Sequence, residues 1–125
     1  MKPLVIYHSN CADGFSAAWC FWHEFRTEVD FHPGVYSAPP PDVAGRQVYL
    51  VDFSYKRAVV EQMLTRAESV VLIDHHKTAI DDLRDLPYLD QYTDLERSGA
   101  QLAWDYLYNV RGGRTLTPDN PAYKH

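Results

Sequence analysis

Short apolar segments that stop at ionisable side chains are the feature that most constrains the fold of this chain. Three such segments, each with the polar residues that follow it, are Leu4–Tyr7 with His8, Gln47–Val51 with Asp52, and Val70–Ile73 with Asp74-His75-His76. Continuous apolar runs of this length are typical of strands that are buried on both faces, as in a parallel sheet. Helical patterns separate the runs, so the sequence predicts an α/β fold.

The remaining elements complete this prediction. We expect further strands at Val29–Val35 and, briefly, at Pro87–Leu89, with a connecting loop at 38–41. Four helices are expected: from about Phe15 to Arg26, after a cap at Ser54, from a cap at Thr78 to about Leu83, and from a cap at Ser98. The expected architecture is three-layer and Rossmann-like, with a mainly parallel sheet of about five strands and helices on both faces.

Two helices carry more specific expectations. Phe15, Ala18, Trp19, Trp22 and Phe25 recur at helical spacing, which predicts an aromatic stripe packed on the sheet. In the last helix, Gln101 stands three residues after Ser98, as in a capping box. The aromatic residues of that last helix allow two interpretations, burial in the core or exposure as the surface of a homodimer. They are Trp104, Tyr106 and Tyr108.

Composition and charge limit the function classes. The 125 residues are 46% hydrophobic and 23% charged, which suits a single globular domain over residues 1–125. The net charge is −5 and no basic run occurs, which argues against tight non-specific binding of duplex DNA. Neither a signal peptide nor a membrane span is indicated, and Cys11 and Cys20 form no disulfide framework. We therefore expect a cytoplasmic protein that does not interact with membranes.

The polar residues at the strand ends predict a ligand site, because ligands of parallel α/β sheets bind beyond the carboxyl ends of the strands. Packing alone hardly explains Asp74-His75-His76, since burying an uncompensated polar group costs roughly 2–7 kcal/mol. Asp and His provide the oxygen and nitrogen ligands that Mn²⁺, Mg²⁺ and Zn²⁺ accept. The sequence thus predicts a divalent-metal site where these residues meet.

Other elements are ambiguous when each is taken alone. Asp13 could bind the same metal or simply cap a helix, and Asp52 could be a turn former. The start of the last helix, beside Arg97, could bind a phosphate through free N–H groups or be an ordinary capped helix. A phosphorelay receiver domain with Asp52 as phosphoacceptor is another alternative, but its first strand would end in acidic residues rather than His8-Ser9-Asn10.

The ordered segments HSNCADG, VDFS, DHH and DLERSGAQLAW resemble the four motifs of the DHH phosphoesterase superfamily, and the resemblance runs from about Val5 to Tyr106. It implies a phosphoesterase that hydrolyses a nucleotide or short oligonucleotide phosphodiester through metal-activated water. Mn²⁺ is the expected cofactor, with Mg²⁺ or Zn²⁺ as alternatives. The implied catalytic residues are Asp52, as a bridge between two ions, and His76, in contact with the scissile phosphate. The implied metal ligands are His8, Asp13, Asp52, Asp74 and His75, and the other substrate-binding residues are Arg97, Ser98 and Gly99.

The sequence departs from the family pattern in three respects. Cys11 stands where many members have a first-motif Asp, Asp119 is the only carboxylate after the last predicted helix, and no second substrate-binding domain is expected. These departures leave an alternative open. The chain could be a catalytically impaired DHH-like module that binds metal, nucleotide or a protein partner.

Overall fold

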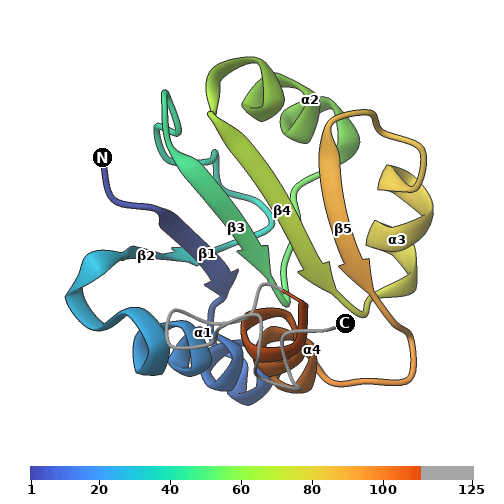
Figure 1. Ribbon diagram of the computed structural model, residues 1–125. Coiled ribbons are helices and arrows are strands. Elements are labelled where there is room, and N and C mark those ends of the chain that lie inside the picture. The colour runs from blue at the N-terminus through green and yellow to red at the C-terminus, as the bar shows by residue number, and fades with distance from the viewer. Residues whose placement is uncertain (111–125) are drawn as a thin grey trace.

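The computed structural model describes residues 1–110, in which five strands form one fully parallel sheet. The strands lie in the order β2-β1-β3-β4-β5, and their arrowheads meet at one edge of the sheet (Figure 1). Their bounds are β1 Leu4–His8, β2 Asp30–Gly34, β3 Gln47–Val51, β4 Ser69–Asp74 and β5 Leu89–Thr93. The predicted α/β architecture is confirmed.

Helices cover both faces of the sheet (Figure 1). Their bounds are α1 Ala12–Phe25, α2 Arg57–Arg66, α3 Lys77–Leu83 and α4 Gly99–Asp105, with a short 3₁₀ turn at Arg26–Glu28 and a π-helical turn at Tyr106–Val110. Successive strand residues alternate between the two layers. Val51 and Ile73 pack with α1 and α4, whereas Leu50 and Leu72 pack with α2 and α3. Both layers are therefore apolar, which is why the strands read as continuous apolar runs.

The strand order creates a switch point between β1 and β3. From β1 the chain first adds β2 on one side, and β3, β4 and β5 then extend the sheet on the other. Crossovers therefore diverge to opposite faces beside the ends of β1 and β3, which opens space there for a ligand. His8 ends β1 and Asp52 directly follows β3, so the topology brings these two side chains to that space.

The predicted stripe on the first helix is wrong for its three largest exposed rings, whereas Ala18 and Phe25 are buried as expected. Phe15, Trp19 and Trp22 are 67%, 46% and 44% exposed, and the helix begins at Ala12 rather than near Phe15. α1 packs closely along α4, and its buried face near that contact consists partly of small residues, including Gly14 and Ala17. Small side chains allow the helices to approach, and the rings of Phe15, Trp19 and Trp22 lie on the exposed side of α1. The spacing of Phe15, Trp19 and Trp22 therefore marked the outer side of the helix.

The last helix divides its aromatic residues. Tyr106 is buried in the core between α1 and the sheet, whereas Trp104 is exposed. The core interpretation therefore holds for Tyr106 and not for Trp104. Within residues 1–110, no helix combines the length and apolar character that crossing a bilayer requires.

Two of the three predicted caps are wrong. The Ser54 hydroxyl donates to the Tyr55 carbonyl, and α2 begins only at Arg57, whose N–H donates to Asp82. Thr78 lies inside α3, which follows His76 directly. The third cap is confirmed, because Ser98 Oγ accepts the Gln101 N–H at 3.1 Å.

The position of β5 was predicted too early. The strand starts at Leu89, where the predicted strand ended, and continues through the polar residues Asp90 and Gln91. It pairs only with β4 within the described sheet, and such an edge strand tolerates polar side chains that hide it from an apolar pattern.

Gly14 is required where α1 crosses the end of β1. A Cβ at this position would lie 2.2 Å from the His8 carbonyl oxygen, which is a backbone atom with little freedom to move. The better helix propensity of Ala, worth about 1 kcal/mol, cannot offset that collision. We expect Gly14→Ala to lower the free energy of unfolding by about 1–3 kcal/mol. Urea unfolding measures this, with Ser16→Ala on the exposed side of α1 as control; equal stability of both variants would contradict the stated contact.

Candidate metal centre

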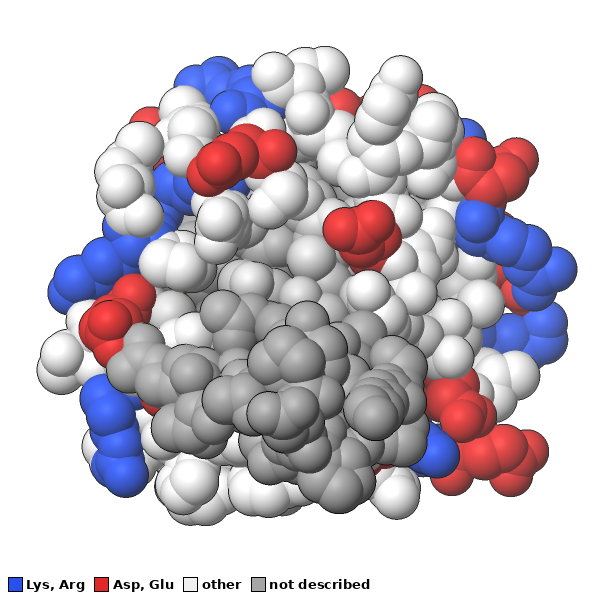
Figure 2. Space-filling view, in the orientation of Figure 1, with Lys and Arg blue, Asp and Glu red and all other residues white. Residues whose placement is uncertain are grey.

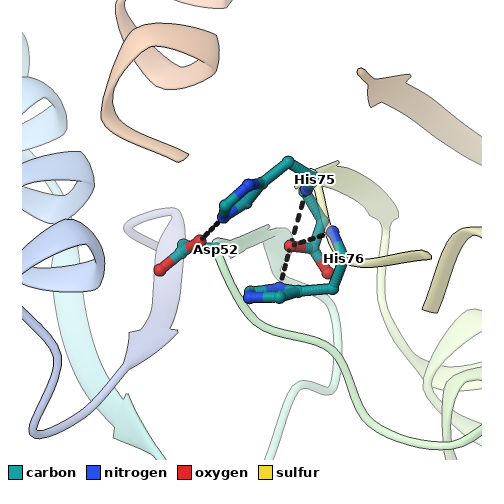
Figure 3. Close-up of side chains that lie close together, drawn as sticks. Asp52, His75 and His76 are labelled. Carbon is teal, nitrogen blue, oxygen red and sulfur yellow. Dashed lines mark hydrogen bonds and ion pairs between the residues drawn. The ribbon is translucent and has the colours of Figure 1, made fainter. Parts of the chain in front are cut away.

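Three strand ends deliver the predicted residues to one place, as the sequence pattern indicates. His8 ends β1, Asp52 follows β3 and Asp74 ends β4. His75 Nε2 lies 2.8 Å from Asp52 Oδ1, and His8 Nδ1 lies 3.9 Å from Asp52 Oδ2. Figure 3 shows the Asp52 carboxylate and the His75 ring pointing toward one another, with His76 nearby.

Asp52 is the centre of this arrangement. Its carboxylate is only 1% exposed, and its backbone has φ 53° while its N–H donates to the Ile73 carbonyl at 2.8 Å. A non-glycine residue with positive φ is strained and is frequent at functional sites. Gly99 leaves room for the carboxylate, since a Cβ there would lie 2.5 Å from Asp52 Oδ1. The strand end and α4 thus fix this side chain from two sides.

Asp52 belongs to two groups of side chains that could each hold a metal ion. Within each group, the candidate ligand atoms lie within 4.8 Å of one another. One group has only oxygen and nitrogen donors, whereas the other includes a thiol. The groups are Asp52, Asp74, His75 and His76, and His8, Cys11 and Asp52.

Two buried polar atoms in these groups lack a hydrogen-bond partner in the described part of the chain, as expected of atoms that bind a cation. His8 Nδ1 and Asp74 Oδ2 have no hydrogen-bond partner among residues 1–110. Unpaired buried polar atoms of this kind are costly and call for a ligand, an ion or a water molecule. A divalent ion in each group would compensate the unpaired atom of that group, and the donor types match Mn²⁺, Mg²⁺ or Zn²⁺.

The second oxygen of Asp74 orients the histidines. Asp74 Oδ1 accepts the His75 N–H at 2.8 Å and lies 2.6 Å from His76 Nδ1 (Figure 3). A carboxylate on one ring nitrogen fixes the imidazole and leaves the other nitrogen, Nε2, for a ligand. Asp74 is thus placed both to contact a cation and to position His76.

Asp13 lies beside this centre with both carboxylate oxygens engaged. Asp13 Oδ2 accepts the Gly99 N–H at 2.8 Å, and Oδ1 accepts the Ala100 N–H at 3.0 Å. Asp13 Oδ2 is also 3.2 Å from His75 Nε2. Asp13 is absent from both groups of converging ligand atoms, so its role as a metal ligand stays a prediction.

Of the two interpretations of the start of the last helix, the structure supports the capped helix and not a phosphate site with free N–H groups. The N–H groups of Gly99 and Ala100 bind Asp13, and Ser98 accepts the next one, from Gln101. The anion at the start of α4 is therefore a side chain of the protein itself. Arg97 pairs with Asp94 and Asp105 nearby, and its contact with a substrate stays a prediction.

The two central carboxyl groups have opposite pKa shifts. Burial, and then repulsion by Asp13, raises the pKa of Asp52 to about 6, although His75 and His76 act in the other direction. Burial alone would raise the pKa of Asp13, but the Ala100 and Gly99 N–H groups, with Asp52 and His75, hold it below its ordinary value. Carboxyl groups that differ in this way are typical of functional sites.

A cleft of about 460 Å³ adjoins the centre, with Asp74 and His76 on one side. Two of its other lining residues, Tyr36 and Lys56, were missed in the sequence. Lys56 follows the Asp52 segment closely and could have been noticed, whereas Tyr36 lies in a loop without periodicity. On the face shown in Figure 2, Lys and Arg lie scattered around the outline of the molecule and form no continuous basic patch.

No protein-family model matches this sequence. The chain is similar to an uncharacterized protein of Acanthamoeba polyphaga mimivirus, with 26% identity over 137 aligned residues. The alignment covers 97% of this chain and 30% of the viral protein, so the chain spans less than a third of the length of this relative.

The raised pKa of Asp52 predicts that the free energy of unfolding of the metal-free protein depends on pH. Because the folded-state pKa of about 6 exceeds the ordinary 3.8, stability falls as the pH rises through this interval and stays low above it. Asp52→Asn removes the buried charge, so its free energy of unfolding should exceed that of the parent by about 1–3 kcal/mol near pH 8. Near pH 4 the parent and Asp52→Asn should have similar free energies of unfolding.

Urea unfolding in the presence of a chelator checks this prediction. Asp90→Asn, an exposed carboxylate on β5, serves as the control and should not show the same pH dependence. A parent protein whose stability relative to Asp52→Asn does not change between these pH values would contradict the burial penalty.

Proposed function

We propose that this protein is a metal-dependent phosphoesterase that hydrolyses a nucleotide or short oligonucleotide phosphodiester. One observation carries the proposal: a buried carboxylate, Asp52, is shared by two groups of potential metal ligands. Two divalent ions held by these residues would lower the pKa of a bound water and stabilise the attacking and leaving oxygens of a phosphoryl group. The order of the four DHH-like motifs supports the same reaction class.

The donor types favour a particular metal in each group. Asp52, Asp74 and His75 provide oxygen and nitrogen, which suit Mn²⁺, our proposed cofactor, or Mg²⁺, and His76 of the same group is left for the substrate. The group with Cys11 adds a sulfur donor, which suits Zn²⁺ better than Mn²⁺. The Cys11 sulfur lies 3.9 Å from Asp52 Oδ2.

His76 is the side chain best placed to meet the phosphate. It is partly exposed, lines the cleft, and is held at Nδ1 by Asp74. A fixed imidazole at the side of a substrate can donate a hydrogen bond to a phosphate oxygen or to the leaving group. Asp52, by contrast, is too buried to contact substrate directly, and its burial also disfavours the phosphoacceptor role of a receiver domain.

A module that binds without turnover is the second candidate. The observation favouring it is that Asp13 is committed to the α4 N–H groups and that Cys11 replaces the other first-motif carboxylate. Metal titration combined with hydrolysis of bis-p-nitrophenyl phosphate separates the candidates. Binding of Mn²⁺, Mg²⁺, Co²⁺ or Zn²⁺ without release of nitrophenol would favour the binding module.

Two variants test the assigned roles. Asp52→Asn should abolish Mn²⁺-supported hydrolysis and leave the circular dichroism spectrum unchanged, because both groups lose their common carboxylate. His76→Ala should lower kcat by about 100-fold and Mn²⁺ affinity by less. Steady-state kinetics and isothermal titration measure both effects, with Asp90→Asn as control. An Asp52→Asn variant of parental activity would refute the bridging role.

Exchange of Cys11 tests the metal preference. Cys11→Asp replaces the sulfur donor by oxygen, so the ratio of Mn²⁺ to Zn²⁺ affinity should rise by about tenfold or more, equivalent to about 1.4 kcal/mol. Competitive metal titration measures this ratio. Cys20→Ala, which removes the buried thiol in the α1 layer, should leave it unchanged; an equal ratio in Cys11→Asp and the parent would exclude the thiol as a ligand.

A further inference from the structure

An exposed tyrosine lies beside the candidate metal centre, in contact with the rings of Phe53 and His8. Tyr36 is 60% exposed, yet its ring stacks on buried Phe53 with centroids 4.9 Å apart and planes at 29°. It also lies 5.3 Å from the His8 ring. A large aromatic side chain that is ordered by a stack on one side and open elsewhere is a preformed platform for another planar group.

The support beneath this platform is itself tightly packed. Phe53 is fully buried and meets the Tyr55 ring edge-on at 4.9 Å. Gly34, at the end of β2, allows Phe53 to occupy this place, because a Cβ there would lie 2.8 Å from the ring. Tyr36 therefore rests on a fixed base, and a ligand that stacks on it loses little free energy in ordering the protein.

The same cleft has a cation without an acidic partner. Lys56 is exposed and forms no ion pair or hydrogen bond through its side chain within residues 1–110. The next residue, Arg57, is engaged by Asp82, Asp85 and Glu61. The Lys56 ammonium is thus available for an anion.

We propose that this cleft binds a nucleoside monophosphate, with the base stacked on Tyr36 and the phosphate between Lys56 and His76. The volume of about 460 Å³ lies in the range of small-ligand sites. Base stacking on an aromatic side chain requires an unpaired base, so the ligand is a mononucleotide or the end of a single strand, not a duplex. The inference rests on the proposed phosphoesterase function, because it assigns the nucleotide that this reaction retains or releases.

Binding of an inert ligand tests the assignment without turnover. The probe is the methylenephosphonate analogue of adenosine 5′-monophosphate, whose P–C bond resists hydrolysis, compared with methylphosphonate, which lacks the nucleoside. Isothermal titration with the full chain and Mn²⁺ should show tighter binding of the analogue. Tyr36→Leu should weaken it by about 5- to 100-fold, whereas Tyr36→Trp should retain it.

Lys56 and two control variants complete the experiment. Lys56→Ala should weaken both the nucleotide analogue and methylphosphonate, by about tenfold, because it removes the contact to the phosphorus group. Tyr88→Leu changes an exposed tyrosine and Lys2→Ala an exposed lysine. Both residues lie at the N-terminal ends of their strands, β5 and β1, away from the metal centre, so both variants should bind the two probes as the parent does. Equal affinity for the two probes, or unchanged affinity in Tyr36→Leu, would overturn the proposal.

The outcome separates this inference from the proposed function. A preference for the nucleotide analogue that is lost in Tyr36→Leu supports the nucleotide site, whether or not the protein hydrolyses a phosphoester. Absence of hydrolysis would count against the phosphoesterase function alone. Hydrolysis of bis-p-nitrophenyl phosphate without any preference for the nucleotide analogue would overturn the nucleotide site alone.

Discussion

The burial of the Asp52 carboxylate is the constraint on which the rest of the structure depends. A carboxylate with so little exposure must find compensation, and here it has the His75 ring at 2.8 Å and a raised pKa. Its position requires a positive φ after β3, a glycine at the start of α4 and a partner from the end of β4. Residues from separate parts of the chain therefore fix the position of one side chain. This convergence is difficult to explain by packing and is readily explained by a cation.

The sequence predicted those parts that follow from strand burial. Runs such as Val70–Ile73 are apolar because both faces of the sheet are covered, and a parallel sheet gathers the residues after them at one edge. His8, Asp52 and His75 could therefore be placed together before any coordinates were known. The meeting of these side chains depends only on the strand period and the direction of the strands, and not on the bounds of the helices.

The parts that failed depend on pairwise packing between segments distant in sequence. Helical spacing identified the aromatic residues of α1 but not the side on which they lie, which the close contact with α4 decides. The phosphate site at α4 failed for a related reason: nothing local to Ser98 or Gly99 indicates that Asp13 already occupies their N–H groups. The sequence did not indicate a role for Tyr36, because the position of its ring depends on Phe53 and Gly34, which belong to other segments.

The contact between Asp13 and α4 has a consequence for biosynthesis. The carboxylate and the Gly99 amide are separated by 86 positions, so the bond joins the first helix to the last described one. A nascent chain that emerges from the ribosome exposes Asp13 long before its partner is made. Gly99, which shapes the space around Asp52, arrives equally late. The site is thus completed only after α4 has been made, and a metal captured earlier by the nascent chain would meet an incomplete set of ligands.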